Sequence, residues 1–160
     1  MNDMRIIRGL VAGVVMLGAT AVAMPAAHAD TVNCSIIEIE ASTADAPSMD
    51  AGLKPLERKL KKPPFSSWNS FKQLGSQALS LESMKPGTAN LVHGKATLIL
   101  RDVQPPGAKK SRLSLGISLD DGGGKRVLDS KVNVDAGDYF VVGRSLPANK
   151  GHLVALTCSP

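Results

Sequence analysis

The side chains best suited to acid–base or metal chemistry are two histidines and a pair of glutamates. His93 and His152 each stand beside a glycine, far apart in the sequence. A zinc site needs three or four ligands in a compatible geometry, so we expect both histidines on separate exposed turns. Glu38 and Glu40 lie two residues apart, on one face of an expected strand. Paired carboxylates can hydrolyse glycosides, but on a first strand we expect these to face solvent.

Other motifs predict no catalytic residue, metal ligand or cofactor. Serines are abundant, yet no Gly-x-Ser-x-Gly elbow is present. Residues 122–125 read Gly-Gly-Gly-Lys but lack the spacing of a phosphate-binding loop. The carboxylates of 120–121 and 135–138 fall in turn-like segments and fit no EF-hand. A small secreted hydrolase built around His93 or His152 therefore remains only a secondary hypothesis.

The compartment follows from residues 1–29, which have the pattern of an export signal. Arg5 and Arg8 precede an apolar run over 10–24, and Ala27-His28-Ala29 supplies the small residues before a cleavage site. The run is shorter than the roughly 20 residues of a membrane span, and no later segment approaches that length. We expect cleavage before Asp30, a mature domain over 30–160, and a location in the periplasm, at the cell surface or outside the cell.

Two cysteines, Cys34 and Cys158, lie near the two ends of this mature chain. In an oxidising compartment, an isolated pair is most simply a disulfide. The bond would link the first strand to the last. A redox role fits less well, because redox cysteines usually form a Cys-x-x-Cys pair, and a lipoprotein would need a cysteine at the cleavage site.

The fold class follows from period-two patterns. Leu113, Leu115, Ile117 and Leu119 alternate with small or polar residues, as in a strand with one buried face. Further strands are expected near 32–41, 71–81, 95–101, 127–134, 139–142 and 153–158, separated by turn sequences such as 120–124 and 135–138. The sequence predicts a mainly β domain, an antiparallel β-sandwich or partly open barrel.

One short helix is expected before these strands. Leu53, Leu56 and Leu60 share a helical face, Pro55 favours a start near Lys54, and Pro63-Pro64 ends the helix. The other face is basic. Residues 54–72 carry a net charge of +5, whereas the whole mature chain, with 17 basic and 13 acidic residues, carries +4. The mature chain is thus only mildly basic, and no nucleic-acid partner is expected.

The same segment contains three of the chain's five aromatic residues. The candidate contact residues are Lys54, Arg58, Lys59, Lys61, Lys62, Phe65, Trp68 and Phe71. Basic and aromatic side chains together suit an anionic glycan, a lipid head group or an acidic envelope protein. The structural alternative is that the aromatics plug one end of the sandwich while the lysines form a solvated face. Full burial of Trp68 would rule out stacking on a glycan.

Residues 60–72, Leu-Lys-Lys-Pro-Pro-Phe-Ser-Ser-Trp-Asn-Ser-Phe-Lys, resemble a pattern in small secreted proteins of Gram-negative bacteria with no assigned function. The later Gly-Asp-Tyr-Phe-Val-Val-Gly of 137–143 is similar too. The resemblance implies a β-rich envelope domain and no activity.

We therefore expect an exported binding or structural module of the cell envelope without catalysis, with its contact surface in 54–71. The rival is a secreted inhibitor or adhesin-like domain that binds through the loops at 104–111 or 145–151.

Overall fold

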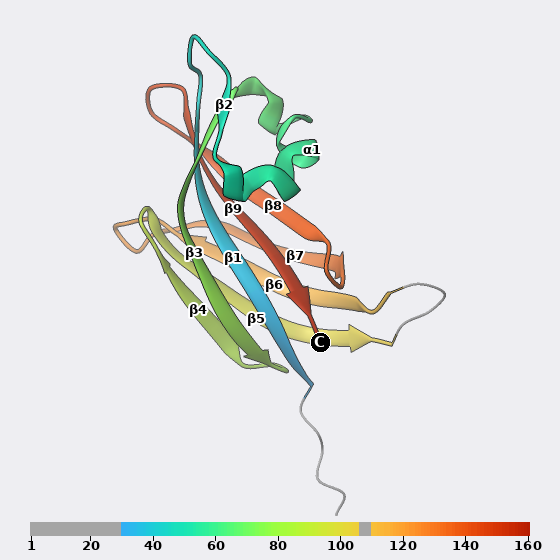
Figure 1. Cartoon of the computed structure of the whole chain (residues 1–160). Coiled ribbons are helices and arrows are strands. Elements are labelled where there is room, and N and C mark those ends of the chain that lie inside the picture. The colour runs from blue at the N-terminus through green and yellow to red at the C-terminus, as the bar shows by residue number, and fades with distance from the viewer. Residues whose placement is uncertain (1–29, 106–109) are drawn as a thin grey trace, which may run out of the picture.

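The computed structural model describes residues 30–105 and 110–160. The predicted export signal over 1–29 and the centre of the predicted loop at 104–111 lie outside the described residues. Two sheets pack face to face and do not close into a barrel (Figure 1). The predicted antiparallel sandwich with a short helical segment near its N-terminus is confirmed.

The first sheet has five strands in the order β2-β3-β1-β9-β8, and the second has four in the order β4-β5-β6-β7. All neighbouring strands are antiparallel except the short β2, which runs parallel to β3. The strand bounds are β1 Thr31–Ser42, β2 Ser48–Met49, β3 Ser70–Glu82, β4 Pro86–Leu91, β5 Gly94–Gln104, β6 Arg112–Asp120, β7 Arg126–Asp135, β8 Tyr139–Leu146 and β9 Lys150–Ser159.

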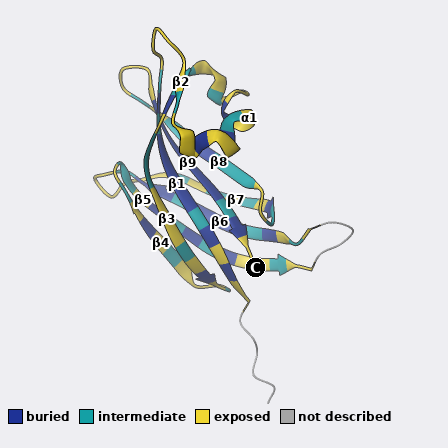
Figure 2. Cartoon of the chain, viewed as in Figure 1, coloured by how far each residue is buried: buried dark blue, intermediate teal, exposed yellow. Residues whose placement is uncertain are grey.

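The main core lies between the sheets, where buried residues of both sheets gather (Figure 2). It contains few aromatic side chains. Alternate residues in the first half of β1 point into it, namely Val32, Cys34 and Ile36. The predicted alternation in β6 is confirmed, with Leu113, Leu115, Ile117 and Leu119 buried. Gly116, on the opposite face of β6, lies beneath the side chain of Arg101.

A second core lies on the outer face of the five-stranded sheet, beneath a helical segment that we call the cap, residues 51–68. The cap comprises the 3-10 helix η1 Ala51–Leu56, the single α-turn α1 Glu57–Leu60 and the 3-10 turn η2 Phe65–Ser67. Leu53, Leu56 and Leu60 are fully buried against the sheet, which confirms the predicted apolar face. The helical segment begins at Ala51 rather than near Lys54, because Pro55 is accommodated inside a 3-10 helix.

Several predicted boundaries shift. Pro86, predicted in a turn, begins β4, and the predicted loop at 145–151 shortens to 147–149 because β8 and β9 extend into it. The turn predicted at 120–124 is confirmed. The Asp121 carboxylate accepts hydrogen bonds from the backbone amides of Gly123 and Lys125, and Gly124 has the positive φ that such a turn needs. Turn formation thus accounts for this acidic residue.

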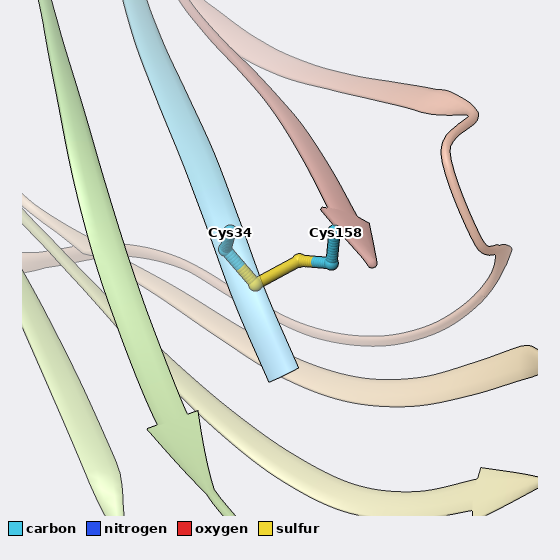
Figure 3. The surroundings of a disulfide bond; sticks show 2 residues. All are labelled: Cys34 and Cys158. Atoms are coloured by element: carbon cyan, nitrogen blue, oxygen red, sulfur yellow. A yellow bond between two sulfur atoms is a disulfide. The ribbon is translucent and has the colours of Figure 1, made fainter. Parts of the chain in front are cut away.

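The predicted disulfide joins Cys34 of β1 to Cys158 of β9 (Figure 3). The two cysteines are directly opposite one another in adjacent antiparallel strands, with their Cα atoms 4.0 Å apart. The bond therefore links the first and last strands within one sheet and points into the main core.

Candidate functional site

The cap presents all five predicted contact cations to solvent. Lys54, Arg58, Lys59, Lys61 and Lys62 are all exposed. Lys61 pairs with Glu57 one helical turn away, and this bond holds the pKa of Glu57 below its ordinary value. Among the described residues, Lys54, Arg58, Lys59 and Lys62 form no ion pair with a carboxylate. Four cations of the cap are thus free to meet an anionic ligand.

The three aromatic residues of the segment lie at different depths. Phe71 is buried in the second core, whereas Phe65 and Trp68 are half-buried at its margin. Trp68 donates a hydrogen bond from Nε1 to the backbone carbonyl of Asn149 at 2.9 Å. Because Trp68 is not fully buried, stacking of a ligand on its ring stays compatible with the structure. The aromatics pack on the outer face of a sheet rather than at an end of the sandwich.

Shallow hollows surround the cap. One of about 290 Å³ lies beside Trp68, Phe71 and Met49, and another of about 350 Å³ lies between Trp68 and the β8–β9 turn. Two more, of about 430 and 270 Å³, separate the cap from β8 and share Lys59 and Lys62. Every predicted contact residue except Lys54 thus lines one of these four hollows.

Gly151 sets how closely Trp68 approaches the sheet. A Cβ atom at position 151 would come within 2.7 Å of the Trp68 ring, so Gly151→Ala should displace the indole. We expect a loss of about 1–3 kcal/mol in stability, as for an overpacked core. Trp68 is the only tryptophan, so its fluorescence should also shift to the red. Gly122→Ala, at a glycine with open space around it, is the control, and an unchanged spectrum for Gly151→Ala would contradict this packing.

A second polar site was not predicted. The expectation of exposed, separate histidines is wrong, because His152 lies inside β9 with 1% of its surface exposed and His93 is half-buried in the β4–β5 turn. Their ring centroids are 5.1 Å apart. Glu38, expected to face solvent, is only 3% exposed. We call this set the polar cluster; it comprises Glu38, Glu40, His93, Arg144, Lys150 and His152.

Glu38 is the centre of the polar cluster. Its carboxylate accepts hydrogen bonds from the backbone amides of Val92 and His93, at 2.7 and 2.9 Å, and lies 2.9 Å from Nε2 of His152. Burial raises the pKa of Glu38, but the bonds from His152 and from the two amides together outweigh it, so this pKa lies below its ordinary value. The Glu38 carboxylate of the five-stranded sheet thus hydrogen-bonds to the β4–β5 turn of the four-stranded sheet, and these bonds link the two sheets.

The outer members of the polar cluster are more accessible. Glu40 lies 3.2 Å from Lys150 and 3.9 Å from Nε2 of His93. Arg144 of β8 reaches the carbonyl of His93 from Nη2 at 3.4 Å. Glu38 and His152, the closest acid–base pair, have nearly no exposed surface. A substrate cannot reach that pair in this conformation. The pair therefore suits a structural role in holding the two sheets together better than hydrolysis.

Over residues 30–105 and 110–160, no three side chains of His, Cys, Asp or Glu are arranged to hold a metal ion. Within the same ranges, no helix has the length and apolar character needed to cross a membrane.

The fold and the candidate site define an open, disulfide-linked β-sandwich with a basic cap. No family model, curated protein or solved structure matches the chain.

Proposed function

We propose that this protein is an exported, non-catalytic binding module of the cell envelope that contacts an anionic partner through the cap. The observation that carries the proposal is a set of exposed cations around hollows beside β8 that, over residues 30–105 and 110–160, form no ion pair: Arg58, Lys59 and Lys62. Such a concentration of one charge on a concave surface attracts opposite charge and speeds association. The disulfide supports export, because such bonds persist in oxidising compartments.

The cap also offers apolar contact beside the charges. Phe65 lines the hollow that contains Lys59 and Lys62, and Trp68 lines two others. Aromatic side chains and arginine are enriched in protein interfaces and in their energetic hot spots. Cations beside half-buried aromatics therefore favour a contact surface over a merely solvated face.

The test is a matched pair of charge reversals in the exported, purified protein. One variant carries Arg58→Glu, Lys59→Glu and Lys62→Glu in the cap. The control carries Arg101→Glu, Lys125→Glu and Lys131→Glu, which changes the net charge equally. These control residues are also exposed and, among the described residues, form no ion pair, but they lie on or next to strands of the four-stranded sheet. Leaving Lys61 intact preserves its pair with Glu57.

Binding is measured at low and moderate salt to three probes: a polyglutamate peptide, dextran sulfate and vesicles containing phosphatidylglycerol. We expect the cap reversal to weaken binding to at least one probe by about tenfold or more, the sum of several modest charge contacts. The control should bind as the native protein does. Equal weakening by both reversals would mean that only net charge matters, and no effect of either would move the contact surface to the loops at 104–111 or 145–151.

A further inference from the structure

The strand beside the basic cap has an unpaired edge. β8 is the last strand of the five-stranded sheet and hydrogen-bonds only to β9 (Figure 1). Within the described part of the chain, no other strand pairs with its outer side. The backbone amides and carbonyls that point away from β9 are therefore open to another strand.

This edge has few of the features that normally prevent strand addition. β8 pairs with β9 over eight consecutive residues without a bulge. Its first half, Tyr139-Phe140-Val141-Val142, contains strong strand formers and neither proline nor charge. Protected edges usually contain lysine, proline or a bulge. The start of β8 is thus a regular template for an added strand.

The hollows beside this edge are basic. The larger is lined by Arg58, Lys59 and Lys62 on the cap side and by Tyr139 on the strand side. The smaller lies between Lys59, Lys62 and Phe65 of the cap and Phe140 and Val141 of β8. A strand added to β8 would therefore lie beside the cations Arg58, Lys59 and Lys62.

Among the residues that the structure describes, Asp138 is the one carboxylate that lines either hollow. It is bound by Lys110 at 2.8 Å. That hydrogen bond, followed by the charges of Lys110 and Lys59, lowers the pKa of Asp138, so it stays ionised and paired. Asp138 is thus already paired with Lys110, and within the described residues Arg58, Lys59 and Lys62 form no ion pair with it or with another carboxylate.

These observations together select one kind of ligand. We propose that the free edge of β8 takes an extended acidic segment of a partner polypeptide as an added strand, with its carboxylates on Arg58, Lys59 and Lys62. Side chains on one face of a strand repeat about every 7 Å, so alternate acidic residues would meet the cap while the backbone pairs with β8. A glycan or a lipid has no backbone with this spacing of donors and acceptors. The inference rests on the cap being a contact surface.

The experiment uses a synthetic peptide of about eight residues, a usual strand length, that alternates valine and glutamate. Amide hydrogen exchange is followed in the exported protein with and without peptide. We expect amides in β8 to exchange about tenfold more slowly when the peptide is bound. The amides of β7, an edge strand of the four-stranded sheet, should exchange at unchanged rates. A peptide of the same sequence with alternate backbone nitrogens methylated should lose binding, because it cannot complete the ladder. Changing the peptide leaves the fold of the protein untouched.

The outcomes separate this inference from the proposed function. Equal binding of the methylated peptide, or unchanged exchange in β8, would overturn strand addition while the cap remains a contact surface. Binding of dextran sulfate or vesicles through the cap without any peptide binding would overturn the choice of ligand alone. Binding of the alternating peptide that survives the cap reversal would contradict the role of the cap itself.

Discussion

Replacing both Cys34 and Cys158 by alanine is expected to lower the free energy of unfolding by about 2–5 kcal/mol. The bond joins residues 124 positions apart, so its loss restores much conformational freedom to the unfolded chain. Both cysteines are buried in the main core, and the double variant also loses some packing. Urea unfolding at neutral pH measures the effect.

The native protein under reducing conditions is the matched control, since it lacks the bond but keeps both side chains. Its unfolding midpoint should fall toward that of the double alanine variant. Midpoints that coincide for oxidised and reduced protein would show that the bond contributes little to stability.

Replacing Glu38 by alanine is expected to destabilise the protein by about 3–5 kcal/mol, because each hydrogen-bonding group left without its partner costs about 1–3 kcal/mol. The change leaves two backbone amides, of Val92 and His93, and the ring of His152 without their acceptor. Glu40→Ala is the control, because Glu40 is partly exposed and meets Lys150 near the surface. We expect that variant to lose less than about 1 kcal/mol, and equal losses for the two variants would contradict the central place of Glu38.

The same carboxylate predicts a pH dependence. The pKa of Glu38 in the folded protein lies below its ordinary value of 4.5, so its contribution to stability is present above that value. As the pH falls through the lower, folded pKa, the carboxylate is protonated and the contribution is lost. Urea unfolding from about pH 6 to about pH 3 should show a decline that is smaller in Glu38→Gln. Parallel declines in native and variant protein would contradict this origin.

The fold class was predictable because it depends on the alternation of apolar and polar residues along the strands and on the turn residues between them. β6 shows strict alternation, and residues 120–124 combine aspartates with glycines that accept a hairpin turn. The predicted strand boundaries were wrong where a residue's structural preference did not decide between strand and turn, as at Pro86. This residue occupies the first position of β4. Because β4 is an edge strand, the missing backbone amide is tolerated there. The 3-10 helix η1 was not predicted, because the spacing of the leucines alone does not distinguish a 3-10 helix from an α-helix.

The polar cluster was missed although the sequence contains a signal for it. Glu38 has the same parity as Cys34 and Ile36, which places it on the inward face of β1. Extending the antiparallel register from the pair Cys34 and Cys158 sets Glu40 opposite His152. His93 could not be found in this way, because it comes from the other sheet and its position depends on how the two sheets pack.

The apolar and basic faces of the cap were predicted from the sequence, but the position of the cap on the sheet was not. Leucine spacing placed Leu53, Leu56 and Leu60 on one face, and the cations followed on the other. The location of this segment beside β8 depends on the strand order, which the sequence pattern did not contain. The free edge and its basic hollows therefore became visible only in the structure.

The most direct test of the central claim, that the cap is the contact surface, is lysine footprinting. The exported protein is acetylated with and without a saturating amount of whichever anionic probe binds it most tightly, and the modification rate of each lysine is read by mass spectrometry. We predict strong protection of Lys54, Lys59 and Lys62, with Lys125 and Lys131 modified at unchanged rates. Protection confined to Lys125 and Lys131, or spread evenly over all lysines, would contradict the account.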